Sequence, residues 1–461
     1  DLEEVKVSEM SKHEAEQVIK TPDFQGFFSN TSRLIERALG QEFNLMDEFF
    51  AEEDENKDND RLERGSKLHK KFVFQSDKEM DRAVTSIDWS PSQPEILLAS
   101  YSKSREWNMD EPDGLIDIFS VSLQGRPELT LNCQYEITKA MFNPHNPNIV
   151  IGSTMSGYLL EWDIRAKKEP VSGGLAAERK NRSQPIQKSC LAQNGHQYPV
   201  YCLSVIGYHN QHSIVSISND GKMCNWRPTV LVDPQSFNFL GMPKDPANPA
   251  SATTEAQSTI ASGQDRQQIY AHCLDFTEGE QEYFYVGSED FNIYQCNQRQ
   301  GGAVQRACKH HDAPVTSVHV HPGVSQSEKH GEMSELLLSS SMDWTVKLWA
   351  PNSRQEPVMT FESAQEYVYD ARWSPTHPSV FASCDAEGFV DIWNINANTE
   401  LPVVRKPISE RNSPLNCLRW SIDGRRIAVG DSQGYVTMLA CDSELYNPKP
   451  DDFDKIVDLV H

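Results

Sequence analysis

The chain has 461 residues and a formal net charge of −24 at pH 7, with 67 Asp and Glu against 43 Lys and Arg. Nucleic acids and anionic lipids attract clusters of Lys and Arg, so this balance argues against either as the main partner. The sequence holds no apolar run of 18 residues and no signal peptide, which argues against a membrane span and against secretion. The ten cysteines form no C-x-x-C pair, a usage typical of reduced proteins of the cytosol.

Residues 1–46 are predicted to form a short helical segment. Thr21 and Pro22 supply an N-cap and a first-turn proline. The apolar residues that follow recur at helical spacing and predict one apolar stripe. Its members are Phe24, Phe27, Phe28, Ile35 and Leu39, with Leu34 beside them. Such a stripe requires a partner, and we prefer a groove on another protein to the alternative, packing against the rest of this chain.

Residues 47–66 are dominated by Asp, Glu and Asn and are predicted to be an acidic, solvated linker.

Residues 67–446 then repeat a pattern. Seven units each hold an apolar segment, a second segment ending in small residues, a polar turn and a third apolar run, and such alternation around Asp or Gly turns predicts antiparallel hairpins. A tandem array of these sheets must pack radially or stack. The predicted fold class is therefore all-β, a seven-bladed β-propeller preceded by a short N-terminal helical segment. The units open at Val84, Ile137, Val200, Ala271, Val315, Val368 and Leu415.

The last unit supplies only three of the four strands that a blade needs. Residues 67–75, with Phe72, Val73 and Phe74, form a predicted strand without a neighbouring hairpin partner. We expect this strand to complete the last blade and close the ring, which removes the exposed sheet edges. The polar stretches 102–112, 166–193, 228–266 and 323–332 are predicted to be insertions. Residues 447–461 form a C-terminal tail in which Phe453, Ile456 and Val457 favour a short final helix.

Two units carry a polar pattern that resembles the hydrogen-bond network of WD repeats. His196, Asp220 and Trp226 lie around the third unit, and His311, Asp343 and Trp349 lie around the fifth. Because one active site does not need two copies, we interpret these residues as structural and not as Ser-His-Asp catalysis.

No metal, cofactor or enzymatic activity is predicted. Cys308, His310 and His311, and the pair His319 and His321, lack the four-ligand spacing of zinc sites. The sequence contains no P-loop, no dinucleotide glycine fingerprint and no kinase motifs.

Several stretches together resemble dynein intermediate chains, most closely those of cytoplasmic dynein. They are 111–114, 199–202, 216–222, 343–349, 367–378 and 428–432, in order along the chain. The helical segment, with Phe27 and Phe28 and residues 33–39, resembles the part of these chains that binds a roadblock-type light chain.

The resemblance implies a non-catalytic subunit of a minus-end-directed microtubule motor in the cytoplasm. Its propeller would bind the dynein heavy-chain tail, and its helix would bind a roadblock-type light-chain dimer. The family's longer N-terminal arm, which binds other dynein light chains and dynactin, is expected to be missing from this chain. Two alternatives stay open: an axonemal outer-arm intermediate chain of the cilium, and a generic WD-repeat scaffold unrelated to motors.

Three aromatic residues are candidates for heavy-chain binding. In a propeller, the loops before the first strands and the turns between second and third strands share one face. Tyr198, Trp344 and Tyr367 are predicted to lie there, exposed as interface anchors. The alternative for Trp344 is packing against the neighbouring blade.

Overall fold

The structure is a computed structural model that describes eleven stretches of the chain and five positions before them. These are residues 67–75, 82–105, 112–121, 126–165, 182–191, 194–208, 211–243, 266–277, 282–323, 336–409 and 413–460, with Thr21, Phe24, Phe27, Phe28 and Thr31. The chain divides into two compact units, Asp1–Gly65 and Ser66–His461, and the second unit contains the repeats.

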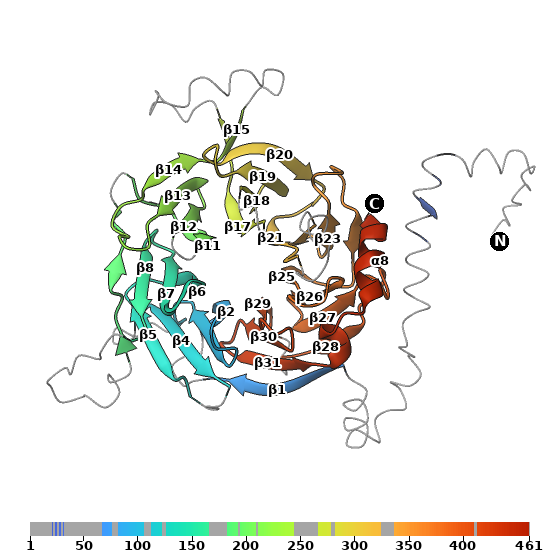
Figure 1. The fold of residues 1–461 in the computed structure, drawn as a ribbon, viewed down its shortest axis with the longest axis horizontal. Helices are drawn as coiled ribbons and strands as arrows, with labels where there is room; N and C mark the ends of the chain where they lie inside the picture. Colours follow the sequence, from blue (N-terminus) through green and yellow to red (C-terminus); the bar gives the residue numbers. More distant parts are fainter. Residues whose placement is uncertain are drawn as a thin grey trace, which may run out of the picture. The chain divides into compact units, whose positions relative to one another are not determined.

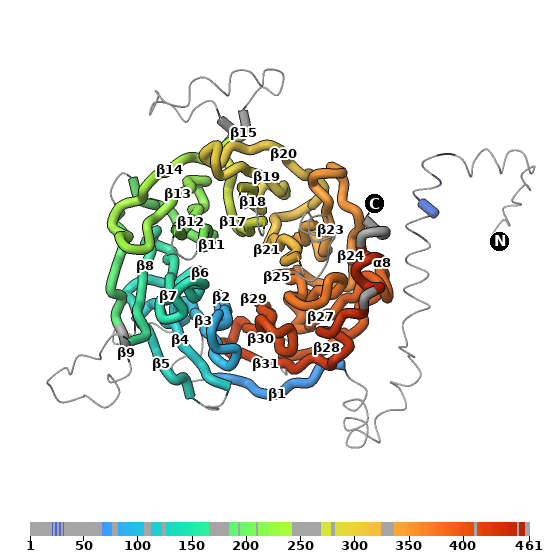
Figure 2. The backbone as a smooth tube through the Cα atoms, viewed as in Figure 1, coloured from blue at the N-terminus to red at the C-terminus, as the bar shows by residue number. Residues whose placement is uncertain are grey.

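The second unit is a ring of seven antiparallel sheets around a central opening (Figure 1; Figure 2). The first strand of each blade lies nearest the opening, and each begins at the residue predicted for it. The prediction of a seven-bladed propeller is therefore confirmed. The inner strands are β2 (Val84–Trp89), β6 (Ile137–Asn143), β11 (Val200–Tyr208), β17 (Ala271–Phe276), β21 (Val315–Val320), β25 (Val368–Trp373) and β29 (Leu415–Trp420).

The outer strands follow in chain order within blades 1–6, whereas the outermost strand of blade 7 comes from the start of the propeller sequence. Blade 1 also carries a fifth strand, β9, which pairs in parallel with β5. The strands of blades 1–3 are β3 (Ile96–Tyr101), β4 (Gly114–Ser120), β5 (Leu129–Cys133), β9 (Arg182–Ser183), β7 (Asn146–Thr154), β8 (Leu159–Asp163), β10 (Gln187–Lys188), β12 (Gln211–Ser218), β13 (Lys222–Trp226) and β14 (Ser236–Phe239). Those of blades 4–7 are β18 (Tyr283–Ser288), β19 (Asn292–Asn297), β20 (Ala303–Lys309), β22 (Leu337–Ser341), β23 (Val346–Trp349), β24 (Met359–Phe361), β26 (Val380–Asp385), β27 (Phe389–Asn394), β28 (Val404–Pro407), β30 (Arg426–Asp431) and β31 (Val436–Cys441).

Two of the predicted insertions contain regular structure, so that prediction is partly wrong. The fourth strands of blades 2 and 3, β10 and β14, fall within 166–193 and 228–266. A further hairpin pairs β15 (Gly241–Pro243), in the second range, with β16 (Arg266–Gln268), which begins at the last residue of that range. β10 has only two residues and every residue of β14 is exposed, so neither shows the alternation that marks a half-buried strand.

The hydrophobic core lies between neighbouring blades. One cluster joins blades 5 and 6 through Leu338, Phe361, Phe381 and Trp393. The Phe381 and Trp393 rings lie parallel, with centroids 5.9 Å apart. Because each blade shares its core with the next, no blade can bury its apolar faces unless its neighbours are in place.

The ring closes where the first strand meets the last blade. β1 (Leu68–Phe74) pairs antiparallel with β31, with Leu68 opposite Cys441 and Phe74 opposite Val436. Leu68 and Phe74 are buried in the cores on either side of blade 7. The predicted closure is confirmed.

Two helices follow the ring, α7 (Ser443–Tyr446) and α8 (Pro450–Val460). Ile456 is buried and Phe453 half-buried against the core of blades 5 and 6, and Asn396 Nδ2 donates to the Asp452 carbonyl at 2.9 Å. The predicted final helix is confirmed. Among the residues that the structure describes, no helix is long and apolar enough to cross a membrane.

The closure yields the first prediction. Deleting residues 1–66 keeps β1 and should leave the melting temperature of the propeller nearly unchanged. Deleting residues 1–76 removes β1, exposes the edge of β31 and takes away two buried side chains, each worth roughly 1.5–3 kcal/mol. Thermal unfolding followed by circular dichroism compares the two variants. Equal melting temperatures would contradict the closure.

Candidate functional site

One face of the propeller is defined by a hydrogen bond that recurs in all seven blades. The first backbone N–H after the second strand donates to the carbonyl of the residue just before the inner strand, at 2.8–3.1 Å. These bonds hold the turns between second and third strands against the loops that enter the blades, and we call the resulting surface the upper face. The pairs are Ser102–Ala83, Met155–Glu136, Asn219–Pro199, Glu289–Tyr270, Met342–Pro314, Ala386–Tyr367 and Ser432–Pro414.

Large apolar side chains are exposed on the upper face from blade 2 to blade 6. The three predicted residues Tyr198, Trp344 and Tyr367 all lie there, with 56%, 47% and 44% of their surface exposed. Sequence reasoning missed three others in equivalent loops. These are Met155, Tyr270 and Phe291.

Two of these side chains occupy positions that favour glycine. Phe291 and Trp344 have φ angles of 70° and 69°, in the left-handed region. At the matching turn position, blades 2, 3, 6 and 7 carry glycine with positive φ: Gly157, Gly221, Gly388 and Gly434. An aromatic residue held in this conformation costs on the order of 1–3 kcal/mol. The adjacent turns of blades 4 and 5 thus carry exposed aromatic rings at an energetic cost to the fold. The signal that could have found Phe291 is the replacement of a turn glycine by an aromatic residue.

In blade 5 the predicted polar residues lie together in one chain of hydrogen bonds. Trp349 Nε1 donates to Ser339 Oγ at 2.8 Å, and Ser339 Oγ lies 2.7 Å from His311 Nε2. His311 Nδ1 lies 2.7 Å from Asp343 Oδ2. A neutral imidazole with its proton on Nδ1 satisfies every contact. Asp343 also accepts from the backbone N–H of Thr345 at 3.0 Å, so the chain of bonds ends in the turn that carries Trp344.

The directions of the pKa shifts in this hydrogen-bond network agree with a neutral His311. Burial lowers the pKa of His311, and the hydrogen bond to Asp343 opposes that shift. Burial alone would raise the pKa of Asp343. The hydrogen bonds from His311 and Thr345 outweigh burial and hold the pKa of this carboxyl well below its ordinary value.

Blade 3 has a related arrangement with a different use of its aspartate. Trp226 Nε1 donates to Ser216 Oγ at 2.7 Å, which lies 2.6 Å from His196 Nε2. His196 Nδ1 lies 4.0 Å from Cys224 Sγ, whereas Asp220 accepts from the Ser218 hydroxyl and from the Lys222 N–H within its own turn. Burial lowers the pKa of His196 to about 3, so this imidazole is neutral at physiological pH. The expectation that both blades share one hydrogen-bond pattern therefore needs correction. The turn aspartate binds the histidine in blade 5, whereas the hydrogen bonds of Asp220 with Ser218 and Lys222 stay within its own turn.

The histidines considered as metal ligands have protein partners. His321 Nε2 lies 2.9 Å from the Pro378 carbonyl, and His319 Nδ1 accepts from the Trp373 N–H at 3.2 Å. Within the described stretches, no three His, Cys, Asp or Glu side chains gather as a metal site would require. All ten cysteines are described, and none is in a disulfide.

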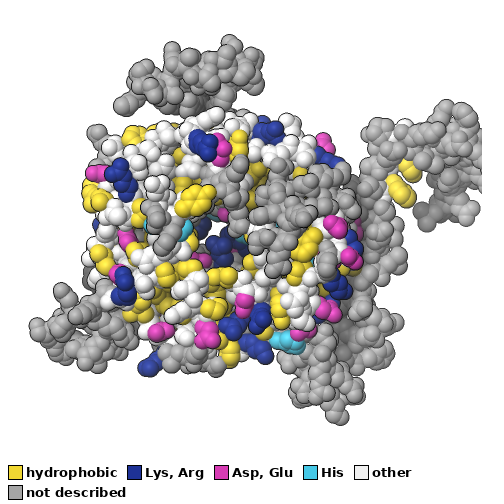
Figure 3. All heavy atoms as spheres, in the orientation of Figure 1, with side chains coloured by type: hydrophobic (Ala, Val, Ile, Leu, Met, Phe, Trp, Pro, Cys, Tyr) yellow, Lys and Arg dark blue, Asp and Glu magenta, His cyan; other side chains and the backbone are white. Residues whose placement is uncertain are grey.

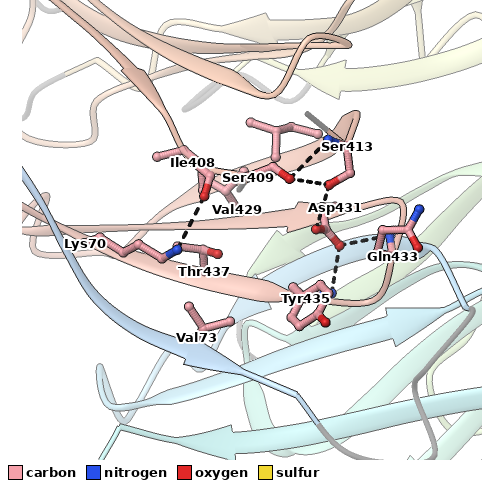
Figure 4. Close-up of a pocket in the computed structure, with 11 residues that line it drawn as sticks. Lys70, Val73, Ile408, Ser409, Ser413, Val429, Asp431, Gln433, Tyr435 and Thr437 are labelled. Carbon is pink, nitrogen blue, oxygen red and sulfur yellow. Dashed lines mark hydrogen bonds between the residues drawn. The ribbon is translucent and has the colours of Figure 1, made fainter. Parts of the chain in front are cut away.

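A cavity of about 280 Å³ lies at the closure, between β1, the end of β28 and blade 7 (Figure 4). The Asp431 carboxylate in it accepts from the Ser413 hydroxyl at 3.0 Å and from the backbone N–H groups of Gln433 and Tyr435. Lys70 Nζ donates to the Ile408 carbonyl at 3.4 Å. These polar contacts tie the closing strand and the blade 6–7 loop to blade 7.

The structure describes part of the predicted N-terminal stripe, in the compact unit Asp1–Gly65. Phe24, Phe27 and Phe28 are helical, and the Phe24 ring centroid lies 6.4 and 6.3 Å from the other two. Phe27 and Phe28 are exposed and Phe24 is half-buried. Leu34, Ile35 and Leu39 lie outside the described residues.

Comparisons with known proteins point to one family. Residues 69–219 and 244–441 match the model of the family described as the dynein axonemal intermediate chain 3 WD40 domain. The chain is similar to a cytoplasmic dynein 1 intermediate chain of Drosophila melanogaster, with 30% identity over 453 residues. The match covers 97% of this chain, which spans 62% of the length of that relative.

The blade 5 contacts yield the second prediction. Ser339→Ala removes the hydroxyl that joins Trp349 to His311 and leaves two buried polar groups without it. Such a loss should lower the free energy of unfolding by about 1–3 kcal/mol. Urea unfolding measures it, with the exposed Ser353→Ala as the matched control. A loss no larger than that of the control would contradict a stabilising role for this network.

Proposed function

The chain belongs to the dynein intermediate chain family, and on that premise we propose that it is a non-catalytic subunit of a cytoplasmic dynein motor, supporting minus-end-directed microtubule transport. Its propeller binds the heavy-chain tail, and its N-terminal segment binds a roadblock-type light-chain dimer. The relative it resembles is longer, and we assign contacts with other dynein light chains and dynactin to an N-terminal arm of that kind.

The observation that carries heavy-chain binding is the pair of aromatic residues in left-handed turns. Phe291 and Trp344 are exposed and come from adjacent blades. A fold that holds aromatic rings at a cost of this kind, and exposes them to water, gains stability only when a partner covers them. Tyr270 and Tyr367 flank the pair on the same face, and aromatic side chains of this type are enriched among interface anchors.

Charge and hydrogen bonding support a binding role over a catalytic one. In blades 3 and 5 the serine hydroxyl binds a buried tryptophan and a buried histidine, and the aspartate hydrogen-bonds within the blade. Burial lowers the pKa of both histidines, so they are neutral at pH 7, and both side chains are buried.

Light-chain binding is supported by the phenylalanine cluster. Phe24, Phe27 and Phe28 follow helical offsets of three and four, and their rings lie close together with two of them exposed. A helix of this kind fits a hydrophobic groove on a partner. Leu34, Ile35 and Leu39 extend the same stripe in the sequence.

A second candidate is an axonemal subunit of the cilium, and the description of the matching family model favours it. The similar Drosophila protein is named as cytoplasmic, and we place this chain in the cytoplasmic complex. A fluorescent fusion of the chain in ciliated cells separates the two, since an axonemal subunit concentrates along the cilium.

The third prediction concerns the upper face. Trp344→Gly should remove the anchor and relieve the left-handed backbone, so we expect the melting temperature to stay level or rise while heavy-chain affinity falls. The fall should correspond to about 2 kcal/mol or more, as for other interface anchors. Tyr367→Ala should also weaken binding, whereas Tyr208→Ala, at the end of β11 away from the upper face, serves as control. Affinity for a heavy-chain tail fragment is measured by surface plasmon resonance. Unaltered affinity in both upper-face variants would place the docking surface elsewhere.

The fourth prediction concerns the N-terminal segment. Phe27→Ala combined with Phe28→Ala should weaken binding of a roadblock-type light chain strongly, because each fully buried phenylalanine contributes roughly 1.5–3 kcal/mol. Isothermal titration calorimetry gives the affinity, and the propeller melting temperature reports that the ring is intact. Ile422→Ala, an exposed apolar change in the propeller, should leave the affinity as in the parent chain. If the double variant binds as tightly as that control, light-chain recognition does not use these rings.

A further inference from the structure

The fifth residue of every inner strand lines the central opening. In all seven strands this residue is partly exposed, whereas the fourth residue is buried in each. The inner strands surround the opening (Figure 1), so their partly exposed fifth residues belong to the wall of a central channel. The seven residues are Asp88, Met141, Ser204, Asp275, His319, Arg372 and Arg419.

Three of these side chains join their blade to the next. Asp88 Oδ2 accepts from the Phe142 N–H and Asp275 Oδ2 from the Val320 N–H, both at 2.8 Å. His319 Nδ1 does the same with Trp373, as described above. Polar acceptors at the fifth position therefore hydrogen-bond to the backbone of the next blade.

Blades 6 and 7 carry arginines at this position, and they form a different hydrogen bond with the next blade. An arginine can only donate, so it cannot accept a neighbouring N–H. Instead the indole of the next blade donates to the arginine carbonyl, from Trp420 to Arg372 at 3.1 Å and from Trp89 to Arg419 at 3.3 Å. The two guanidinium groups are left to face the channel.

Lys139, the third residue of β6, adds another cation to this wall. Arg372 pairs with Asp370 at 2.9 Å. No hydrogen bond or ion pair from the described residues reaches the Lys139 ammonium or the Arg419 guanidinium. Burial, and after it the charge of Arg372 and for Lys139 also that of Arg419, lower the pKa of both groups, and nearby carboxylates oppose the shift. Despite burial, Asp370 and Asp275 raise the pKa of Arg372. Figure 3 shows Lys and Arg side chains at the central opening.

We propose that the central channel binds a small phosphate-bearing anion through Lys139, Arg372 and Arg419. Arginine forks and the lysine ammonium are the groups that recognise phosphate oxygens, and a bound anion relieves their mutual repulsion. Three carboxylates, Asp88, Asp275 and Asp370, also lie in the channel. Anion binding there would therefore depend on where the three cations lie and not on the net charge of the channel. Each of these carboxylates accepts a backbone N–H of the next blade, which fixes its position in the wall.

The test uses the full chain, inorganic phosphate and inorganic tripolyphosphate as probes, and calorimetry at low ionic strength. We expect saturable binding of tripolyphosphate, with phosphate binding more weakly. Lys139→Met and Arg419→Gln should each lower the affinity about tenfold or more, since each removes a hydrogen bond to a charged group. Arg126→Gln, an exposed arginine outside the channel, is the matched control.

Thermal unfolding without added anion shows whether each variant is folded, so that a loss of binding can be assigned to the channel. Arg419→Gln removes the repulsion from Arg372 together with the attraction to Asp88 and Asp370, so its melting temperature should stay close to that of the parent chain. Added tripolyphosphate should raise the melting temperature of the parent and of Arg126→Gln, and not that of the channel variants. No uptake by the parent chain, or equal affinity in parent and channel variants, would overturn the proposal.

Discussion

The antiparallel pairing of β1 with β31 is the contact on which the rest of the structure depends, because it joins the two ends of the propeller sequence. The cores lie between blades, so an open ring would leave the apolar faces of the terminal blades in water. Closure seats Leu68 and Phe74 in the cores on both sides of blade 7. Every other feature of the ring, including the channel and the upper face, exists only once this pairing has formed.

Within the closed ring, blade stability and the interaction face share the same residues. In blade 5, the hydrogen bonds that run from Trp349 through Ser339 and His311 end at Asp343, and Asp343 holds the Thr345 N–H. Trp344 lies between those two turn residues. A buried network thus fixes the turn that carries an aromatic ring in a costly backbone conformation. Strain of this kind persists only where the surrounding structure determines the conformation.

Much of the fold could be predicted from the sequence, since every inner strand carries apolar residues at its first, fourth and sixth positions, and all seven begin where expected. β10 and β14 escaped because short or fully exposed outer strands lack that pattern. Trp344 was found because a tryptophan after the turn aspartate is conspicuous. Phe291 and the channel arginines emerge only when the blades are aligned with one another, which requires the register that the structure supplies.

The most direct test of the account places a photo-crosslinking phenylalanine analogue at position 344 of the full chain, within the assembled complex. A parallel sample carries the analogue at position 208, at the end of β11 away from the upper face. We expect crosslinks from position 344 to the tail of a dynein heavy chain, and none from position 208. An assembled complex in which position 208 crosslinks to the heavy chain and position 344 does not would contradict heavy-chain docking on the upper face.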